Sequence, residues 1–249
     1  MSGHSKWATI KHQKGAKDKA RGKLFAKVLR QVEVAAREGG GDPDANPTLR
    51  TMFQKARDAS IPMDTIERAI KRGTGELEGV TYEQITYEGY APGGVAVLVE
   101  VLTDNRNRTG ADVRSLFSRN GGSIAEPGAV AWQFDRKGQL LVDRKADEDD
   151  LMLAALDAGA EDIADDGELW RVTTPPTDLH RVRAAIEEAG MSVDSADLTM
   201  VPQTTIPLAD AESAKKVLRL IDALDEHDDV QQVHANFDIP DAILETVEA

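Results

Sequence analysis

Residues 81–103 have the sequence TYEQITYEGYAPGGVAVLVEVLT, and they mark the point where the chain changes from helix-forming to strand-forming sequence. The segments Tyr82–Tyr90 and Val95–Leu102 are rich in β-branched and aromatic residues, which favour strands. Between them, residues 91–94 (Ala-Pro-Gly-Gly) form a turn signal, because proline and glycine interrupt regular structure. This stretch predicts two strands, with a helical region before them and a mixed region after them.

The region before these strands shows three helical patterns. From Asp18 onward, apolar residues recur at spacings of three and four, the repeat of a helix with one buried face, until the three glycines at 39–41. Asn46 and Pro47 are the residue types preferred at the N-cap and first position of a second helix, and Pro62 opens a third. Three amphipathic helices with short connections predict a small all-helical unit.

The region after these strands alternates between strand and helix patterns. Residues 139–200 give β-α-β-β-α-β, the ferredoxin-like order, if residues 161–164 form a short strand. The flanking pieces, residues 95–134 and 204–238, each give β-α-β, the first of them with a strand expected at 129–134. The middle unit is therefore expected to be inserted into an outer unit of the same type.

These patterns together predict the fold class and the domain boundaries. The fold class is α+β multidomain, with an N-terminal three-helix domain plus two ferredoxin-like α/β domains, one inserted in the other. A chain of 249 residues suits two or three domains. The predicted domains are a basic all-helical nucleic-acid-binding domain at 1–77, a discontinuous α/β domain at 78–136 and 203–249, and an inserted ferredoxin-like domain at 137–202.

The charge of the chain is strongly polarised. Residues 1–75 contain 16 lysines and arginines against 8 acids, whereas residues 76–249 contain 14 against 36, so that a net charge of −14 conceals a basic segment of +8. Such asymmetry between parts of a chain indicates contact with nucleic acid. The alternative is a solvated basic face that has no partner.

No pattern typical of catalysis is present in the sequence. The chain has no cysteine, and no two of its five histidines have the spacing of metal ligands. Neither a phosphate-binding glycine loop nor a nucleophile motif occurs, and the acidic clusters are typical of solvated helix ends. We therefore expect no enzyme activity, cofactor, metal or small-molecule substrate. Without a membrane-spanning run or a signal-peptide pattern, the expected location is the cytoplasm.

The N-terminal segment supplies most of the predicted nucleic-acid contacts. Its lysines and arginine can each neutralise a phosphate and release counterions. Trp7 can either stack on a base or pack this segment onto the helices, and the sequence leaves both open. The predicted contact residues of this segment are Lys6, Trp7, Lys11, His12, Lys14, Lys17, Lys19, Arg21, Lys23 and Lys27.

A second predicted contact lies at residues 104–109 (Asp-Asn-Arg-Asn-Arg-Thr), at the start of a helix expected over 107–119. The guanidinium groups of Arg106 and Arg108, together with helix-end N–H groups, suit a phosphate or an RNA backbone. The alternative is a capped turn whose arginines pair with local acids.

Seven distinctive motifs are distributed along the chain, namely MSGHSKW at 1–7, IKHQK at 10–14, RGKLF at 21–25, VAAREGGGDP at 34–43, IERAIKRG at 66–73, YEGYAPGG at 87–94 and TDNRNRT at 103–109. Together they resemble the motifs of the YebC/PmpR family of probable transcriptional regulatory proteins. The resemblance covers essentially the whole chain. It departs at 8–9 and at 60–63, where Ser-Ile-Pro-Met stands in place of the family's frequent Asn-Met-Pro-Lys and removes one basic contact.

The resemblance implies a three-domain protein that regulates gene expression by binding DNA. The family also includes the mitochondrial translational activator of cytochrome c oxidase subunit I, which implies an alternative, a translation factor that binds RNA or the ribosome. A flexible lysine-rich segment with one aromatic residue suits backbone and shape recognition of RNA, whereas the first two helices offer arginines and glutamines for base edges in duplex DNA. The sequence leaves the oligomeric state open.

Overall fold

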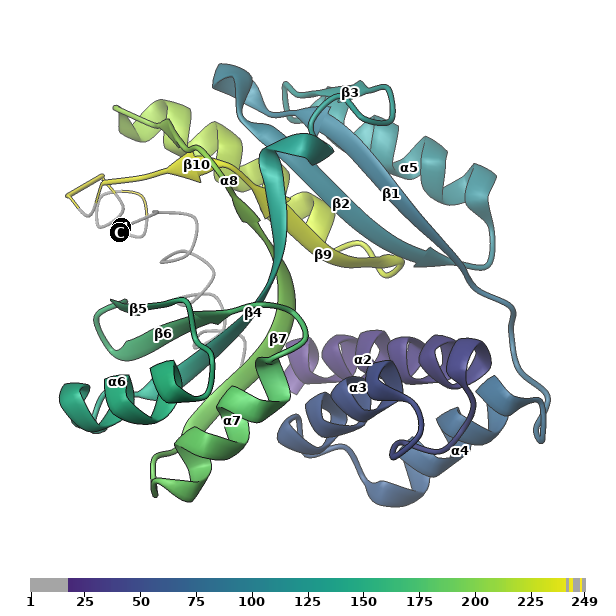
Figure 1. Cartoon of the computed structure of the whole chain (residues 1–249). Helices are drawn as coiled ribbons and strands as arrows, with labels where there is room; N and C mark the ends of the chain where they lie inside the picture. Colours follow the sequence, from purple (N-terminus) through teal and green to yellow (C-terminus); the bar gives the residue numbers. More distant parts are fainter. Residues whose placement is uncertain (1–17, 241, 244–246, 248–249) are drawn as a thin grey trace. The chain divides into compact units, whose positions relative to one another are not determined.

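The structure is a computed structural model that describes residues 18–240, 242, 243 and 247, with side chains from residue 22 onward (Figure 1). In this part the chain has the predicted α+β class, with three helices followed by two four-stranded sheets, which each carry two helices, and a small two-stranded sheet. The described residues divide into two compact units, one containing residues 18–79 with 136–200 and the other residues 80–135 with those from 201 onward. The division into three domains stays a prediction.

The N-terminal helices follow the apolar repeats of the sequence. They are α2 (Asp18–Gly39), α3 (Pro47–Asp58) and α4 (Met63–Thr74). Their shared core is aliphatic and contains Val28, Leu49 and Ile66, each with 1 % or less of its surface exposed. All three predicted helices are confirmed, and their apolar stripes face one another as the repeats require.

Asn46 closes the connection between α2 and α3. Its side-chain oxygen accepts a hydrogen bond from the N–H of Leu49, which caps α3. Its amide group donates to the carbonyl oxygens of Ala35 and Gly40, at 2.8 and 2.9 Å. One buried side chain therefore satisfies the start of one helix and the end of the preceding one.

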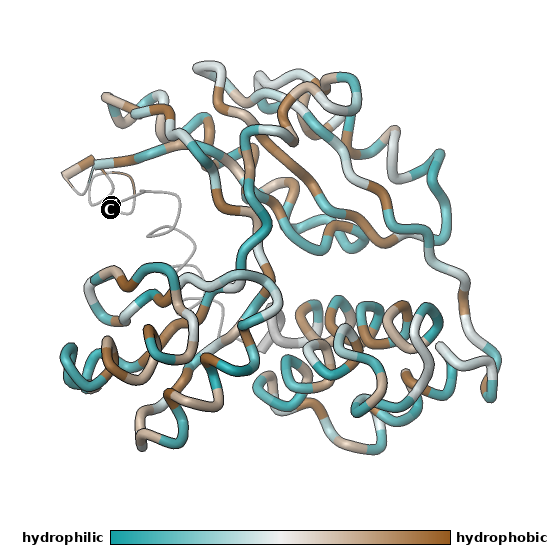
Figure 2. Tube along the Cα trace, viewed as in Figure 1, coloured by the Kyte–Doolittle hydropathy of each residue, from teal (hydrophilic) through white to brown (hydrophobic). Residues whose placement is uncertain are grey.

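The second unit is built on a four-stranded sheet of order β3-β1-β2-β9, with α5 and α8 packed on it. Its elements are β1 (Glu83–Tyr90), η1 (Pro92–Gly94), β2 (Ala96–Thr103), α5 (Arg106–Arg119), β3 (Ser123–Ala125), η2 (Ala131–Gln133), β8 (Ile206–Pro207), α8 (Ala211–Asp225), β9 (Val230–Ala235) and β10 (Phe237–Asp238). The predicted strands on either side of the 91–94 turn are β1 and β2, which pair antiparallel from Glu83↔Thr103 to Tyr90↔Ala96. The central strand β2 is hydrophobic along most of its length (Figure 2) and buried.

The other four-stranded sheet has the order β5-β6-β4-β7. Its elements are β4 (Phe134–Asp143), α6 (Glu148–Asp157), β5 (Asp162–Asp165), β6 (Leu169–Thr174), α7 (Leu179–Glu188) and β7 (Val193–Pro202). The chain thus runs β-α-β-β-α-β, as the ferredoxin-like prediction requires, and the short strand expected at 161–164 is β5. Leu140, Leu151 and Ile186 belong to the core between this sheet and its two helices.

The predicted strand at 129–134 is wrong. Residues 131–133 form the 3₁₀ helix η2, and the next strand starts at Phe134. The strand that follows α5 in this sheet is instead β3, at residues 123–125, and β1, which precedes β2 in the chain, lies between β2 and β3. In addition, β8 does not join the large sheet but pairs in parallel with β10. The outer sheet therefore has the expected helices but a rearranged strand order.

Within the first unit, polar contacts join the helical segment to the sheet segment. Asp58 on α3 accepts two hydrogen bonds from the guanidinium group of Arg183 on α7, at 2.7 and 3.1 Å. Two turns earlier in α3 and about one turn earlier in α7, Thr51 Oγ lies 2.7 Å from His180 Nε2. Burial lowers the pKa of His180, with the charges of nearby arginines acting in the same direction, so the neutral ring is favoured here.

Candidate nucleic-acid interface

Most of the predicted N-terminal contacts lie outside the described residues. These are Lys6, Trp7, Lys11, His12, Lys14 and Lys17. Lys19 and Arg21 belong to the first turn of α2, and their side chains are also outside the description. Their role in binding therefore stays a prediction from sequence, and the choice between stacking and packing for Trp7 stays open.

Lys23 and Lys27 are the predicted contacts whose side chains the structure describes on α2. Lys23 is exposed and Lys27 is half-buried. With Arg30 they follow the spacing i, i+4, i+7, which places them on one face of the helix. The buried residues Val28 and Val32 lie on the opposite face, against α3 and α4. The helix α2 therefore holds a row of cations on the side that the core does not use.

The second predicted contact, residues 104–109, forms a tightly bonded turn before α5. Asn105 caps the helix, because its side chain accepts a hydrogen bond from the N–H of Arg108 at 3.1 Å. The hydroxyl groups of Thr103 and Thr109 lie 2.7 Å apart, and Thr109 also donates to the buried carboxylate of Asp229 at 2.6 Å. The turn is therefore fixed from the end of β2, from its own cap and from the segment before β9.

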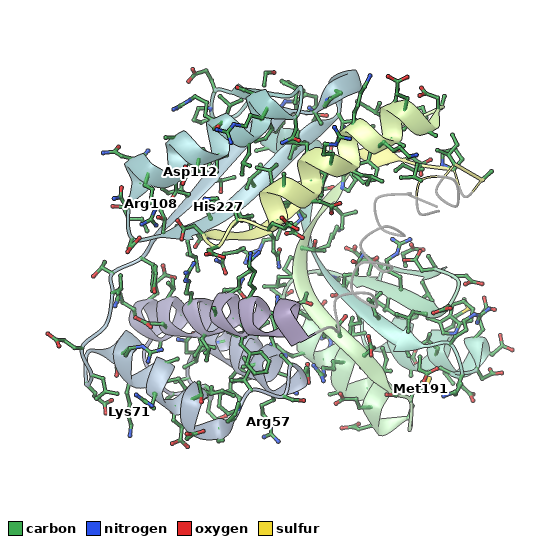
Figure 3. All side chains as sticks on the ribbon, turned by 180° about the vertical axis from the view of Figure 1, so that it is seen from behind. Arg57, Lys71, Arg108, Asp112, Met191 and His227 are labelled. Atoms are coloured by element: carbon green, nitrogen blue, oxygen red, sulfur yellow. The ribbon has the colours of Figure 1, made fainter. Side chains whose placement is uncertain are left out.

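Arg108 is part of that bonded turn. Its guanidinium group lies 2.8 Å from a carboxylate oxygen of Asp229 and 2.8 Å from one of Asp104, and these hydrogen bonds, the one to Asp229 first, raise its pKa. Figure 3 labels Arg108 together with Asp112 and His227 at the same end of the unit. His227 Nε2 lies 3.4 Å from a carboxylate oxygen of Asp112. These contacts favour the alternative of a capped turn for Arg108. Arg106 differs, since it is exposed and has no ion pair within the described part of the chain.

Replacing Arg108 by glutamine is expected to lower the melting temperature but to leave nucleic-acid affinity nearly unchanged. The variant leaves the buried Asp229 without its guanidinium partner, which destabilises the turn. A lost contact with a duplex phosphate would instead weaken binding about eightfold at about 0.1 M salt. A thermal melt and a DNA titration at that salt concentration check the prediction, and an affinity loss above about fivefold contradicts it.

Three further cations of the helical segment are exposed, yet the sequence did not single them out. They are Arg57 on α3 and Arg68 and Lys71 on α4, two of which are labelled in Figure 3. None of the three makes an ion pair among the residues that the structure describes. The apolar repeat in the sequence predicts that these three side chains lie on the solvent side of their helices. It does not predict that they have no acidic partner among the described residues.

Within the part of the chain that the structure describes, no group of three or more histidine, cysteine, aspartate or glutamate side chains is arranged to hold a metal ion. Among the described helices, none is both long and apolar enough to cross a membrane.

Comparison with known proteins identifies relatives over the full length. Residues 5–76 match the family model described as the TACO1/YebC protein N-terminal domain, and residues 82–237 match that for the TACO1/YebC second and third domain. The chain is 59% identical over 249 residues to a probable transcriptional regulatory protein of Rubrobacter xylanophilus and 56% identical over 250 residues to one of Halothermothrix orenii, with 99% of each chain covered. A crystal structure of a conserved hypothetical protein from Aquifex aeolicus matches with a TM-score of 0.83 and 47% identity, over 90% of this chain and 93% of that one.

Proposed function

The chain belongs to the TACO1/YebC family, and we propose that it is a DNA-binding regulator of transcription whose basic N-terminal segment contacts the nucleic acid. The observation that carries this proposal is the charge of +8 in residues 1–75 of a chain whose net charge is −14. Cations concentrated in one segment, while the remainder is acidic, direct a polyanion to that segment. Relatives with more than half of their residues identical are named probable transcriptional regulatory proteins.

In this proposal the protein acts by binding rather than by catalysis, and it works in the cytoplasm. Two of the contacts predicted from the sequence, Lys23 and Lys27, belong to the helix α2. Phosphate contacts of this kind fix position and orientation on the nucleic acid, but they carry no sequence information. Sequence specificity would need separate contacts to base edges.

A second candidate function is that of a translation factor that binds RNA or the ribosome. A lysine-rich segment with a single tryptophan suits recognition of a backbone and an unstacked base, which is common for RNA. The strongly acidic remainder of the chain would be repelled by ribosomal RNA and would then have to face solvent or protein.

Crosslinking in cells, followed by digestion and sequencing of the attached nucleic acid, tests the proposal and separates the two candidates. Enrichment of promoter DNA is expected for a transcriptional regulator, whereas enrichment of ribosomal or transfer RNA would support the translation factor. The control is a variant in which Lys11, Lys14, Lys17 and Lys19 are glutamine, which should recover little of either. If the wild-type protein crosslinks to neither above that control, nucleic-acid binding itself is refuted.

A further inference from the structure

Three arginines of α5 are exposed and have no acidic partner within the described part of the chain. The helix carries Arg106, Arg108, Arg114 and Arg119 but only one acid, Asp112. Arg108 is held by Asp104 and Asp229, whereas no ion pair or side-chain hydrogen bond involves the other three guanidinium groups there. In a chain with 44 acids and 30 lysines and arginines, cations kept away from acids are available to an external anion.

Tyr87 of β1 lies against α5 between two of these arginines. Its hydroxyl oxygen is 3.0 Å from the point where a Cβ atom of residue 110 would lie, and residue 110 is glycine, midway between Arg106 and Arg114. A glycine inside a helix is less stable than alanine, but here any side chain would displace the phenol. The ring of Tyr87 packs against the core, and its hydroxyl has no hydrogen-bond partner among the described residues.

The two arginines are close enough to act on that hydroxyl electrostatically. Burial raises the pKa of Tyr87, and the positive charges of Arg106 and Arg114 oppose the shift. Glu83, four residues earlier on the same strand, acts against the two arginines and raises the pKa of Tyr87. The surface formed by Tyr87, Arg106 and Arg114 therefore holds two positive charges against one negative charge.

We propose that Arg106, Arg114 and the hydroxyl of Tyr87 bind the phosphate backbone of a nucleic acid, as a contact separate from the N-terminal segment. The inference rests on the proposed function and adds a second binding surface to it. Eight residues of helix separate the two guanidinium groups by about 12 Å along the axis, so each can take a different phosphate. Arginine binds phosphate oxygens through two parallel N–H donors, and the phenol can donate a further hydrogen bond between them.

An acidic extended peptide could use the same cations. A phosphodiester chain is favoured because it presents one charge per nucleotide at a regular spacing, which matches isolated arginines two helical turns apart. A poly-glutamate peptide is therefore included in the test as the competing ligand.

The test compares two full-length double variants that change the net charge equally. The first is Arg106→Gln with Arg114→Gln, and its matched control is Lys215→Gln with Arg219→Gln on α8 of the same unit, where both side chains are also exposed and without a partner in the described residues. Binding to a single-stranded RNA oligonucleotide is measured from about 0.05 to 0.3 M salt. The first variant should bind about tenfold more weakly at about 0.15 M salt, with a salt slope smaller by about 1.4, and the control should keep the wild-type slope. Tyr87→Phe keeps the ring in place and should weaken binding about two- to threefold.

The outcomes separate this inference from the proposed function. Equal affinity of the first variant and its control, with wild-type melting temperatures in both, overturns the second surface while leaving the N-terminal contact intact. Loss of poly-glutamate binding with unchanged RNA binding assigns the arginines to an acidic partner and also overturns it. A wild-type protein that binds neither this RNA nor duplex DNA in the same titration refutes the proposed function and this inference together.

Discussion

Replacing Glu88 by alanine is expected to lower the free energy of unfolding by about 2–4 kcal/mol, because three backbone donors, that of the buried Val130 among them, lose their common acceptor. The carboxylate of Glu88 is buried and accepts hydrogen bonds from the N–H groups of Gly128, Val130 and Ala131, at 2.6, 2.7 and 2.9 Å. Nothing else in the described residues is bonded to these three donors. Urea unfolding of the second unit measures the loss, and hydrogen exchange should show that the three amides lose protection.

The same carboxylate should make stability depend on acid pH. Burial raises the pKa of Glu88, but the three backbone hydrogen bonds outweigh burial and leave the pKa below its ordinary value of 4.5. Because the folded-state pKa is the lower one, the contribution to stability is complete above pH 4.5 and is lost as the pH falls through the folded-state value. Glu88→Gln is the control, since it keeps one acceptor oxygen but has no charge to titrate. If the free energy of unfolding falls with decreasing pH in the same way for the wild-type protein and for Glu88→Gln, Glu88 is excluded as the cause.

Glu88 also explains why the strand predicted at 129–134 does not form. The segment Ala-Val-Ala-Trp-Gln-Phe has the composition of a strand, and local pattern alone favours one. Its backbone N–H groups at 130 and 131 are instead taken by a carboxylate 42 and 43 residues earlier in the chain, so they are not available to a sheet. A side chain that remote leaves no signal in the local periodicity.

The elements that were predicted correctly are those whose pattern is local. The helices α2 to α4 follow apolar repeats and caps, and β1 and β2 follow a β-branched composition around a Pro-Gly-Gly turn. In the inserted sheet, short repeats bounded by glycine and proline were enough to give the order β-α-β-β-α-β. These signals depend on neighbours within a few residues, which the sequence displays directly.

The candidate site could be predicted only as far as charge is visible in sequence. The motif at 104–109 presents two arginines that look alike, and both were predicted to contact phosphate. The structure distinguishes the two arginines, because Asp229, 121 residues after Arg108, binds Arg108 and not Arg106. The same holds for Tyr87, which meets Gly110 only because β1 lies under α5. Ion pairs between distant segments decide which cations remain available to a ligand.

Changing Lys11, Lys14, Lys17 and Lys19 to glutamine is expected to weaken binding to duplex DNA by roughly three and a half orders of magnitude at about 0.1 M salt. If each lysine contacts one phosphate, four lost contacts reduce the slope of log K against log salt by about 3.6, and the loss in affinity follows from that slope. The effect should be nearly the same for unrelated DNA sequences, because phosphate contacts carry no sequence information. Affinity is measured by fluorescence anisotropy at several salt concentrations.

The matched control changes four lysines elsewhere to glutamine, namely Lys137, Lys145, Lys215 and Lys216. It alters the net charge by the same amount, and the surface ion pairs that it removes, such as Lys137 with Glu161, contribute little to stability. Comparable losses in the two variants would mean that total charge, not the N-terminal segment, governs binding. A wild-type salt slope in the N-terminal variant would mean that these four lysines contact no phosphate, and the binding surface would then have to be sought among the exposed cations of α3, α4 and α5. The position of the lysines is thus tested independently of their number.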